Sequence, residues 1–449
     1  MRFGTDGVRG SAFVELTPEY VAALGRAAAE VLGGGRWLIG RDTRESGPEF
    51  ERALAAGLTA GGATVLVGGV VPTPAVAFIA ARDGIPAAVI TASHNPFSDN
   101  GVKLFAPGGL KLGDEVEIAV EAAIESAIEA SIEAGSATKA ATGQGDEGHR
   151  CGEPVDVIAA YADHLVSLFP PGCLAGLEIV LDCANGAMSG VADQVARRLG
   201  AMVEVINASP DGRNINDDCG ATAPGALAGA VLARGADLGL AFDGDGDRVI
   251  AIDHDGQSVD GDRMLALAAL QMRDNGELID DTVVITVMSN LGLHHAMAHA
   301  GIHIVETAVG DRYVLEALDS GGYALGGEQS GHLIYRKLAT TGDGLLAGLR
   351  LAQYVHDSRR TLAELAGAAM IGYPQVLLNV PVARRHPGIV DELGDSIAAA
   401  EQALAGDGRV LVRASGTEPL IRIMVEAPTT ALAASTAEGL AAIVRDAFA

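Results

Sequence analysis

Three aspartates alternate with other residues in the sequence DGDGDR that begins at Asp243. Asp243, Asp245 and Asp247 follow the apolar run LGLAF, so their carboxylates come just after an expected strand. Clustered oxygen ligands of this kind suit Mg²⁺ or another hard cation. A calcium-binding EF-hand would need Gly and Glu where this chain has Arg248 and His254, which makes that chemistry improbable. A hairpin turn that binds no metal is the alternative interpretation.

A serine occupies a similar place in TASHNPFSDNGVKLF, which follows the apolar run AAVI. Ser93 is flanked by His94 and is followed ten residues later by Lys103. Serine becomes a nucleophile when a base or a metal lowers the cost of removing its proton. The GxSxG elbow of acyl-transfer enzymes is absent. A turn of Ser, Asn and Pro without chemistry is the alternative.

The segment GGEQSGH carries a carboxylate, a hydroxyl and an imidazole on alternate residues, Glu328, Ser330 and His332. If this segment is an extended loop, the alternation points all three side chains the same way. Such a set suits ligands rich in hydroxyl groups, such as sugars. An ordinary Gly/Glu/Ser turn explains the same residues.

The segment RASGTEPLIRIMVE offers anion-binding groups between two expected strands. Two guanidinium groups, two hydroxyls and exposed amides come from Arg413, Ser415, Gly416, Thr417 and Arg422. This combination is typical of a phosphate-binding loop. Walker A is excluded because none of the four lysines precedes Ser or Thr, and no GxGxxG follows a strand. Near the chain start, Arg9 in FGTDGVRG offers another anion contact.

These loops need a scaffold, and the order of apolar and Ala-rich segments in the first 100 residues predicts a sheet with helices. Short apolar runs over 37–40, 63–67 and 87–91 alternate with Ala-rich stretches over 48–61 and 74–83. Alternating strands and helices indicate βαβ units and a parallel sheet. Ligands of such sheets bind beyond the carboxyl ends of the strands.

The same pattern continues further along the chain. Strands expected over 178–181 and 238–242 end in Asp182 and Asp243, as the first unit has Asp42 at a strand end. A third unit contains strands over 282–288 and 302–306. After Tyr373 the order changes to strand, helix 390–404, strands 409–413 and 420–426, and a last helix, which predicts a smaller α+β domain.

A helix after Gly113 carries a stripe of glutamates four residues apart, at 117, 121, 125, 129 and 133. None has a Lys or Arg partner four residues on, so we expect a solvated face rather than a ligand site. The polar, Gly-rich stretch 135–152 that follows reads as a linker and as the first domain boundary.

Composition limits the partners and the compartment. The 449 residues are 49% hydrophobic, enough for about three or four domains. With 58 acidic against 31 basic side chains and a net charge of -27, we expect no nucleic-acid partner and no acidic membrane. Four scattered cysteines, no signal-like N-terminus and no long apolar run predict a soluble cytoplasmic protein.

Together, FGTDGVRG, TASHNP with NGVKLF, DGDGDR, GGEQSGH and RASGTEPLIRIMVE, in this order, closely resemble the α-D-phosphohexomutase superfamily. The resemblance covers essentially the whole chain and implies a four-domain α/β architecture around a central cleft. Three α/β domains with mixed, mostly parallel sheets would precede the smaller α+β domain. The implied boundaries are 1–152 with the phosphoserine loop, 153–253 with the metal loop, 254–369 with the sugar loop and 370–449 with the phosphate loop.

The resemblance also implies a mechanism. Ser93 would be phosphorylated in the active enzyme, and one Mg²⁺ per chain would bind to its phosphate and to Asp243, Asp245 and Asp247. The phosphoryl group would pass to a sugar phosphate, the bisphosphate would reorient, and the other phosphate would return to Ser93. A glucosamine or glucose 1,6-bisphosphate would act as activator.

Other site residues follow by the same resemblance. Lys103 and His332 would transfer a proton or stabilise charge, with Arg9, His94 and Arg248 around the phosphoryl group. Glu328 and Ser330 would hold sugar hydroxyls, and Arg413, Ser415, Gly416, Thr417 and Arg422 would bind the phosphate that is not transferred. Asp311 and Arg312 in GDRYV would approach the sugar, or else form a salt-bridged turn.

The strings NIND, VMSNLGL, TAVGDRYV, GEQSGH and TGDGLL favour the branch that converts glucosamine 6-phosphate to glucosamine 1-phosphate, a step towards cell-wall UDP-N-acetylglucosamine. Three alternatives stay open: a phosphomannomutase or phosphoglucomutase, a catalytically silent sugar-phosphate-binding protein, and a Mg²⁺-dependent phosphatase. The expected partner is a small phosphosugar, and the expected state is a monomer or homodimer.

Overall fold

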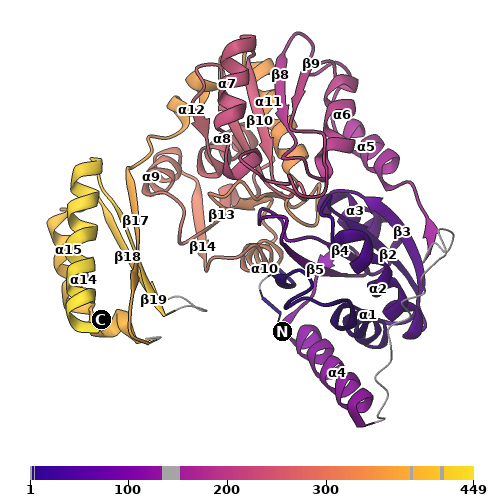
Figure 1. Cartoon of the computed structure of the whole chain (residues 1–449). Coiled ribbons are helices and arrows are strands. Elements are labelled where there is room, and N and C mark those ends of the chain that lie inside the picture. Colours follow the sequence, from indigo (N-terminus) through magenta and orange to yellow (C-terminus); the bar gives the residue numbers. More distant parts are fainter. Residues whose placement is uncertain (1–2, 5, 134–151, 385–387, 415–418, 449) are drawn as a thin grey trace. The chain divides into compact units, whose positions relative to one another are not determined.

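The computed structural model describes residues 3–4, 6–133, 152–384, 388–414 and 419–448, with side chains of 127–133 left aside. The described residues form four sheets (Figure 1). They divide into two compact units, Met1–Val287 with His303–Ala366, and Met288–Ile302 with Gly367–Ala449. No helix among the described residues is long and apolar enough to cross a membrane.

The first sheet has the order β1-β5-β4-β2-β3-β7, with β6 paired to β5. Its strands are β1 (Val8–Ser11), β2 (Arg36–Arg41), β3 (Thr64–Val70), β4 (Ala87–Ile90), β5 (Asp99–Ala106), β6 (Leu110–Lys111) and β7 (Glu153–Pro154). The accompanying helices are α1 (Pro18–Leu32), α2 (Gly47–Ala60), α3 (Thr73–Asp83), α4 (Asp114–Glu133) and α5 (Val157–Ser167). The strands from β4 through β2 and β3 to β7 pair in parallel, whereas β5 pairs antiparallel with β1, β4 and β6.

Strand β2 explains how helices cover both faces of this sheet. Trp37 and Ile39 point into one apolar cluster with residues of α1, α2 and α4. Gly40 faces α3 so closely that a Cβ would come within 2.6 Å of the Val76 side chain. Because successive strand residues point to opposite faces, the sheet is buried from both sides.

The second sheet has the order β12-β11-β10-β8-β9. Its strands are β8 (Glu178–Asp182), β9 (Met202–Ile206), β10 (Leu238–Phe242), β11 (Val249–Asp253) and β12 (Ser258–Val259). The helical segments are η1 (Ala187–Gly190), α6 (Ala192–Arg198), η2 (Gly220–Thr222) and α7 (Gly225–Arg234). Strand β8 is parallel to β9 and β10, while β10 and β11 form an antiparallel pair joined by the aspartate loop.

The third sheet has the order β14-β13-β15-β16. Its strands are β13 (Thr282–Thr286), β14 (His303–Thr307), β15 (Leu325–Gly327) and β16 (Leu333–Tyr335). The helices of this region are α8 (Gly261–Asp274), η3 (Ile279–Asp281), α10 (Asp311–Gly321), α11 (Gly344–Ser358) and α12 (Leu362–Ala369). Helix α9 (Leu291–Ala300) belongs to the second compact unit.

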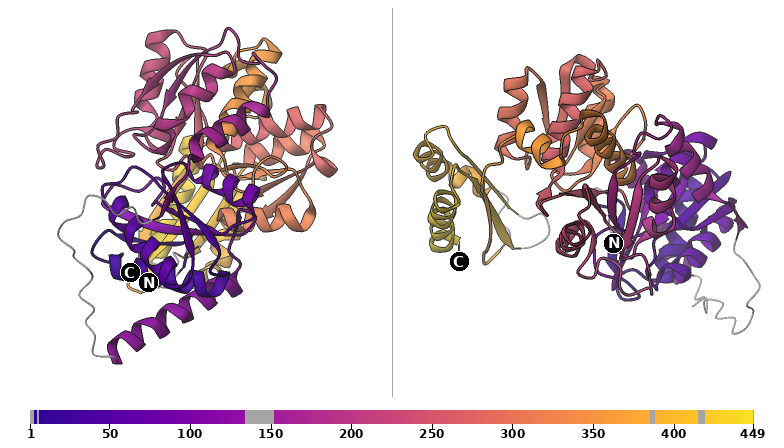
Figure 2. Two further views of the ribbon diagram at one scale, coloured as in Figure 1. Left: turned by 90° about the vertical axis from the view of Figure 1, so that its right-hand side faces the viewer. Right: turned by 90° about the horizontal axis from the view of Figure 1, so that it is seen from above.

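The C-terminal sheet is antiparallel, in the order β17-β19-β18. Its strands are β17 (Gln375–Pro381), β18 (Arg409–Ala414) and β19 (Leu420–Glu426), and its helices are α13 (Ile389–Glu392), α14 (Gly394–Ala403) and α15 (Thr430–Phe448). Helices α14 and α15 cover one face of the sheet over a shared apolar cluster (Figure 2).

The predicted strands and helices coincide with observed elements, with one exception. A single helix over 390–404 is wrong, because α13 ends at Glu392 and α14 begins at Gly394. Leu393 leaves helical geometry with ψ 3°, and glycine is a weak helix former. The predicted linker 135–152 lies, except for Gly152, outside the described residues.

Candidate active site

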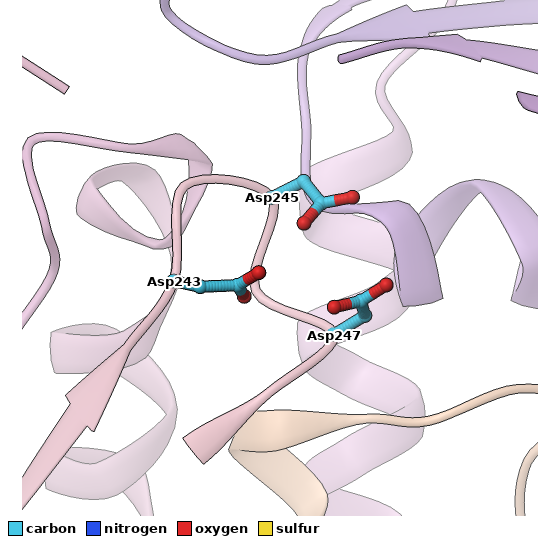
Figure 3. Close-up of side chains that lie close together, drawn as sticks. All are labelled: Asp243, Asp245 and Asp247. Atoms are coloured by element: carbon cyan, nitrogen blue, oxygen red, sulfur yellow. The ribbon is translucent and has the colours of Figure 1, made fainter. Parts of the chain in front are cut away.

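The aspartate loop between β10 and β11 brings its three carboxylates together. Asp243, Asp245 and Asp247 are buried, and each offers an oxygen within 4.8 Å of the others. Figure 3 shows the three side chains turned towards one another. The turn interpretation therefore describes the backbone, and the carboxylates inside it form a cluster that could hold a metal.

Two observations fit a hard divalent cation at this cluster. Oδ1 of Asp245 and Oδ1 of Asp247 are buried and have no hydrogen-bond partner among the described residues. Burial, together with the charges of Asp247 and Asp245, raises the pKa of Asp243 well above its usual range. Mg²⁺ would bind the oxygens that lack partners and would offset the repulsion between the carboxylates.

Ser93 lies in the loop after β4 and is fully buried. Its Oγ donates a hydrogen bond of 2.6 Å to Oδ2 of Asp243, and its backbone N–H donates to Oγ1 of Thr91 at 2.9 Å. The residue has a φ of 52°, in the left-handed region that glycine prefers. The structure thus brings the predicted nucleophile directly against the predicted metal site.

His94 lies beside the serine, with Nδ1 at 3.3 Å from Oγ of Ser93. Burial, with the positive charges of Arg248 and Arg9, lowers the pKa of His94 to about 4. Near neutral pH the imidazole is uncharged, so it can exchange a hydrogen bond with the serine without adding charge to the site.

Lys103 projects from β5, which pairs with the strand that precedes the serine loop. Its Nζ lies 2.8 Å from carboxylate oxygens of Asp245, Asp247 and Asp6. Burial by itself lowers the pKa of Lys103, but the three carboxylates outweigh it and raise the pKa well above its usual value. The side chain is a fixed positive charge next to the metal cluster.

The sugar loop differs from the expected extended form, because GGEQSGH makes a tight turn between β15 and β16. The Glu328 amide donates to the carbonyl of His332 at 3.1 Å, and the Gly331 amide donates to the carbonyl of Glu328 at 3.0 Å. The Glu328 carboxylate accepts from the amide of Gly310 and from Oγ of Ser330 at 3.0 and 3.2 Å. Glu328 and Ser330 therefore share one polar cluster.

His332 lies opposite Glu328 in this turn, and its imidazole contacts the aspartate loop. Its Nδ1 is 3.8 Å from Oδ1 of Asp247, and its Nε2 accepts from the amide of Gly342 at 3.2 Å. Burial lowers the pKa of His332, but the Asp247 carboxylate outweighs burial and raises it. The premise of an extended loop is wrong, and within the turn His332 contacts Asp247, whereas Glu328 contacts Ser330 and Gly310.

Arg9 and Arg248 line a cavity of about 380 Å³ together with Asp6, Gly310, Asp311, Glu328 and other residues of the first compact unit. One Arg9 guanidinium nitrogen lies 2.6 Å from Asp6, and Nε of Arg248 is buried without a hydrogen-bond partner among the described residues. Two guanidinium groups at one cavity are suited to phosphate oxygens.

Sequence reasoning missed an ion-pair network beside this cavity. Asp6 accepts from Arg9, Lys103 and Lys111, and Lys111 also contacts Asp311. An aspartate three residues before an arginine in FGTDGVRG was the available signal. The network joins the N-terminal loop, β5, β6 and the start of α10, so only the fold reveals it.

The contacts of Arg312 agree with the interpretation of GDRYV as a salt-bridged segment. Its guanidinium contacts Asp114, Glu117 and Glu316, the latter two at 3.0 and 3.3 Å. The expectation of an entirely solvated glutamate stripe is therefore wrong at Glu117, which is half-buried. It is also wrong at Glu121, which accepts from the amide of Phe3.

Arg413 and Arg422 are cross-strand partners on β18 and β19. Burial and the neighbouring Arg422 charge lower the pKa of Arg413. Nε of Arg422 is buried without a hydrogen-bond partner in the part of the chain that the structure describes. Two like charges held together are complementary to an anion. Ser415, Gly416 and Thr417 lie outside the described residues.

The chain matches all four domains of the phosphoglucomutase/phosphomannomutase family, domain I over 1–131, domain II over 159–256, domain III over 260–373 and the C-terminal domain over 377–443. It therefore belongs to this family of enzymes. It is 51% identical to a phosphoglucosamine mutase of Rhodococcus opacus, over 98% of both chains, and 50% identical to that of Frankia casuarinae, over 99% of this chain and 98% of the relative.

Solved structures agree on the fold. A phosphoglucomutase/phosphomannomutase family protein from Burkholderia thailandensis is 25% identical with a TM-score of 0.78, over 98% of this chain and 97% of its own. The Aspergillus fumigatus N-acetylphosphoglucosamine mutase in complex with GlcNAc-6P and magnesium is 20% identical with a TM-score of 0.71, over 100% of this chain and 96% of its own.

Proposed function

We propose that this chain interconverts glucosamine 6-phosphate and glucosamine 1-phosphate by way of a phosphoserine at Ser93. The observation that carries the mechanism is the hydrogen bond of 2.6 Å between Oγ of Ser93 and Asp243, inside a buried cluster of three carboxylates. A site that only bound a sugar phosphate would not need a nucleophile beside a metal cluster. The identities of about 50% to phosphoglucosamine mutases support the choice of amino sugar.

Asp243, Asp245, Asp247 and the phosphate on Ser93 would hold one Mg²⁺. When bound, the cation offsets negative charge on the transferring phosphoryl group and on the serine oxygen. Lys103 contributes a second positive charge, which its three ion pairs keep in place. Arg9, Arg248 and His94 surround the phosphoryl oxygens.

The reaction begins when a sugar hydroxyl attacks the phosphorus of phosphoserine. A new P–O bond forms to the sugar, the bond to Oγ of Ser93 breaks, and the hydroxyl proton passes to a group of the chain. His332 is the proposed carrier of that proton, because Lys103 is held as an ammonium by its ion pairs. Glu328 and Ser330 orient the sugar hydroxyls.

The resulting glucosamine 1,6-bisphosphate reorients, and Oγ of Ser93 attacks its other phosphate. Arg413, Ser415, Gly416, Thr417 and Arg422 bind whichever phosphate is not being transferred. A glucosamine or glucose 1,6-bisphosphate would restore the phosphoserine when it is lost. We further propose that the protein acts in the cytoplasm, has no nucleic-acid partner and contributes to the synthesis of UDP-N-acetylglucosamine, as the sequence favours.

A coupled assay on the purified chain tests this function. Glucosamine 6-phosphate and glucose 6-phosphate are each supplied with and without Mg²⁺ and a catalytic amount of glucose 1,6-bisphosphate. We expect the 1-phosphates to form without release of inorganic phosphate, with the larger kcat/KM for the amino sugar. Stoichiometric phosphate release would indicate a phosphatase, and a larger kcat/KM for glucose 6-phosphate would indicate a phosphoglucomutase.

A further inference from the structure

The loop that carries Ser93 is tied to one buried arginine that neither the motifs nor the proposed mechanism uses. Arg44 follows β2, and its side chain is completely buried. A guanidinium group has five N–H donors in a fixed planar arrangement. A buried arginine is stable only if these donors have partners, so the partners reveal what the side chain holds.

All five donors of Arg44 are used. Nε donates to Oδ2 of Asp42 at 2.9 Å, which also pairs the charge. The other four donors reach backbone carbonyls of the serine loop: Nη1 those of Pro96 and Asp99, the latter at 2.9 Å, and Nη2 those of Ser93 and Asn95, at 3.0 and 2.8 Å. One side chain therefore fixes four carbonyls of the loop from Ser93 to Asp99.

Asn216 binds two of the same carbonyls. Its Nδ2 donates to the carbonyl of Ser93 at 2.9 Å and to that of Asn95 at 3.2 Å. Asn216 follows β9 in the domain that carries the aspartate loop, whereas Arg44 comes from the domain of the serine. The carbonyl of Ser93 is thus held by one donor from each of the two domains that build the site.

The anchored carbonyl also touches the aspartate loop. A Cβ on Gly244 would lie 2.6 Å from the carbonyl oxygen of Ser93 and 2.9 Å from Nδ2 of Asn216. Gly244 follows Asp243, the residue that accepts from Oγ of Ser93. The serine backbone, the asparagine amide and the aspartate loop therefore meet at one point.

We propose that Arg44 and Asn216 are positioning residues for phosphoryl transfer, which together hold the Ser93 peptide against the aspartate loop. The inference rests on the proposed function. Ser93 has a left-handed backbone conformation that a non-glycine residue does not adopt without support, and the two side chains supply that support. A small displacement of the reacting oxygen is enough to reduce the rate strongly.

The first test replaces Arg44 by lysine, which keeps the charge but has a single compact donor group. In R44K we expect kcat to fall about 100-fold while KM for glucosamine 6-phosphate changes by less than about threefold. The rate at which glucose 1,6-bisphosphate phosphorylates Ser93, followed by intact mass, should fall by the same factor. Arg41 is the last residue of β2, three residues before Arg44, and pairs with Glu51, so R41K is the matched control and should retain both rates.

A second variant keeps the inference testable if R44K does not fold. Asn216 has a φ of 58°, so N216G preserves the backbone and removes only the amide. We expect about tenfold lower kcat at unchanged KM in a protein that remains folded at the assay temperature. Asn214 bonds to Ser209 and to the Asp211 amide instead, so N214G serves as control and should keep its kcat.

The inference is overturned if folded R44K or N216G keeps kcat and the Ser93 phosphorylation rate within about twofold of the wild type, or if the loss appears in KM alone. A wild-type chain that accepts no phosphoryl group at Ser93 would instead overturn the proposed function. The two failures are distinguishable, because the wild type and R41K are measured first.

Discussion

Thr73 shows how a residue outside the sequence motifs can tune the metal site. Its Oγ1 donates to Oδ2 of Asp245 at 2.6 Å, and its amide donates to the Asp245 carbonyl at 2.9 Å. Lys103 donates to the same oxygen at 2.8 Å, and Oδ1 of Asp245 has no hydrogen-bond partner among the described residues, so the hydroxyl helps to orient the carboxylate with Oδ1 free. Partners behind metal ligands commonly change metal affinity about 10- to 100-fold when they are removed.

We predict that Thr73→Val raises the Mg²⁺ concentration needed for half-maximal activity by about tenfold, with little change in the rate at saturating Mg²⁺. T73S retains the hydroxyl and should require as much Mg²⁺ as the wild type. A Mg²⁺ titration of the mutase rate in a chelator-buffered solution measures the shift. Equal requirements in T73V and T73S would show that the Thr73 hydroxyl has no such role.

Individual residues also mark the limit of prediction from sequence. Ser93, Lys103 and the three aspartates are predicted from short motifs at a strand or strand end, and the structure brings them together. Arg44 and Asn216 act through partners that are distant in sequence, so no local pattern predicts their role. Asp6 has a local partner in Arg9, but its contacts with Lys103 and Lys111 depend on the fold. The sequence leaves Arg312 open between a sugar contact and a salt-bridged turn and predicts a solvated Glu117. Only the packing of α4 near α10 reveals the salt bridge between them.

The aspartate loop packs directly on the serine loop, and Gly244 is the point of contact. Its φ is ordinary, so alanine would fit the backbone, but a Cβ would lie 2.6 Å from the carbonyl of Ser93. We predict that G244A lowers kcat about 100-fold, because the two loops must separate.

Gly229 in α7 has open space around a Cβ, so the control variant G229A should keep kcat and gain about 0.5–1 kcal/mol of stability. Steady-state kinetics and urea unfolding of both variants provide the comparison, and an active G244A would disprove the close packing.

Helix α11 begins at a buried carboxylate whose titration should affect stability. Asp343 caps the helix by accepting from the amide of Leu346 at 2.9 Å, and it accepts from the hydroxyl of Tyr161 at 2.8 Å. Burial outweighs these hydrogen bonds and raises the pKa of Asp343 from 3.8 to about 6. The folded state therefore binds this proton more tightly than the unfolded state does, and the stabilisation is lost as pH rises through about 6.

We predict that the unfolding free energy of the wild type, relative to Asp343→Asn, falls by about 2 kcal/mol between about pH 4.5 and about pH 8. The asparagine keeps the cap acceptor but does not titrate, so other ionisable groups cancel in the difference. Urea unfolding of both proteins across this pH range measures it. A difference that is constant with pH, or that grows in favour of the wild type, would contradict the raised pKa.

Among the elements, strands were predicted more securely than helix boundaries. The apolar runs that form β2, β4, β8 and β10 are buried on both faces, so their nearly continuous apolar composition predicts them as strands. The break at Leu393 and the turn within GGEQSGH depend on local backbone geometry that apolar periodicity does not encode. In the turn, Glu328 lies beside Ser330 and Gly310, and His332 lies beside Asp247 and Gly342.

Over the molecule as a whole, the net charge of -27 and a phosphorylated ligand are compatible because charge acts over short distances. Arg9 and Arg248 line one cavity, and Arg413 and Arg422 form a like-charged pair on the C-terminal sheet. Lys103 and Lys111 are bound to carboxylates at the site. These six basic side chains belong to the segments that the proposed chemistry uses, which a total charge does not reveal.

The central claim is that the phosphoryl group passes through Ser93, and the most direct measurement follows that group on the protein. The purified chain is incubated with glucose 1,6-bisphosphate and then with excess glucosamine 6-phosphate, and the peptide containing Ser93 is analysed by mass spectrometry. With a labelled phosphoryl group on the bisphosphate, we predict a labelled gain of about 80 Da on that peptide. The excess glucosamine 6-phosphate should then replace the label with unlabelled phosphate while the gain in mass remains, because each turnover returns a phosphoryl group to Ser93. Ser93→Ala should show neither change and should lose at least about 1000-fold in turnover. Turnover of S93A close to that of the wild type, or transfer to a different residue, would contradict the account.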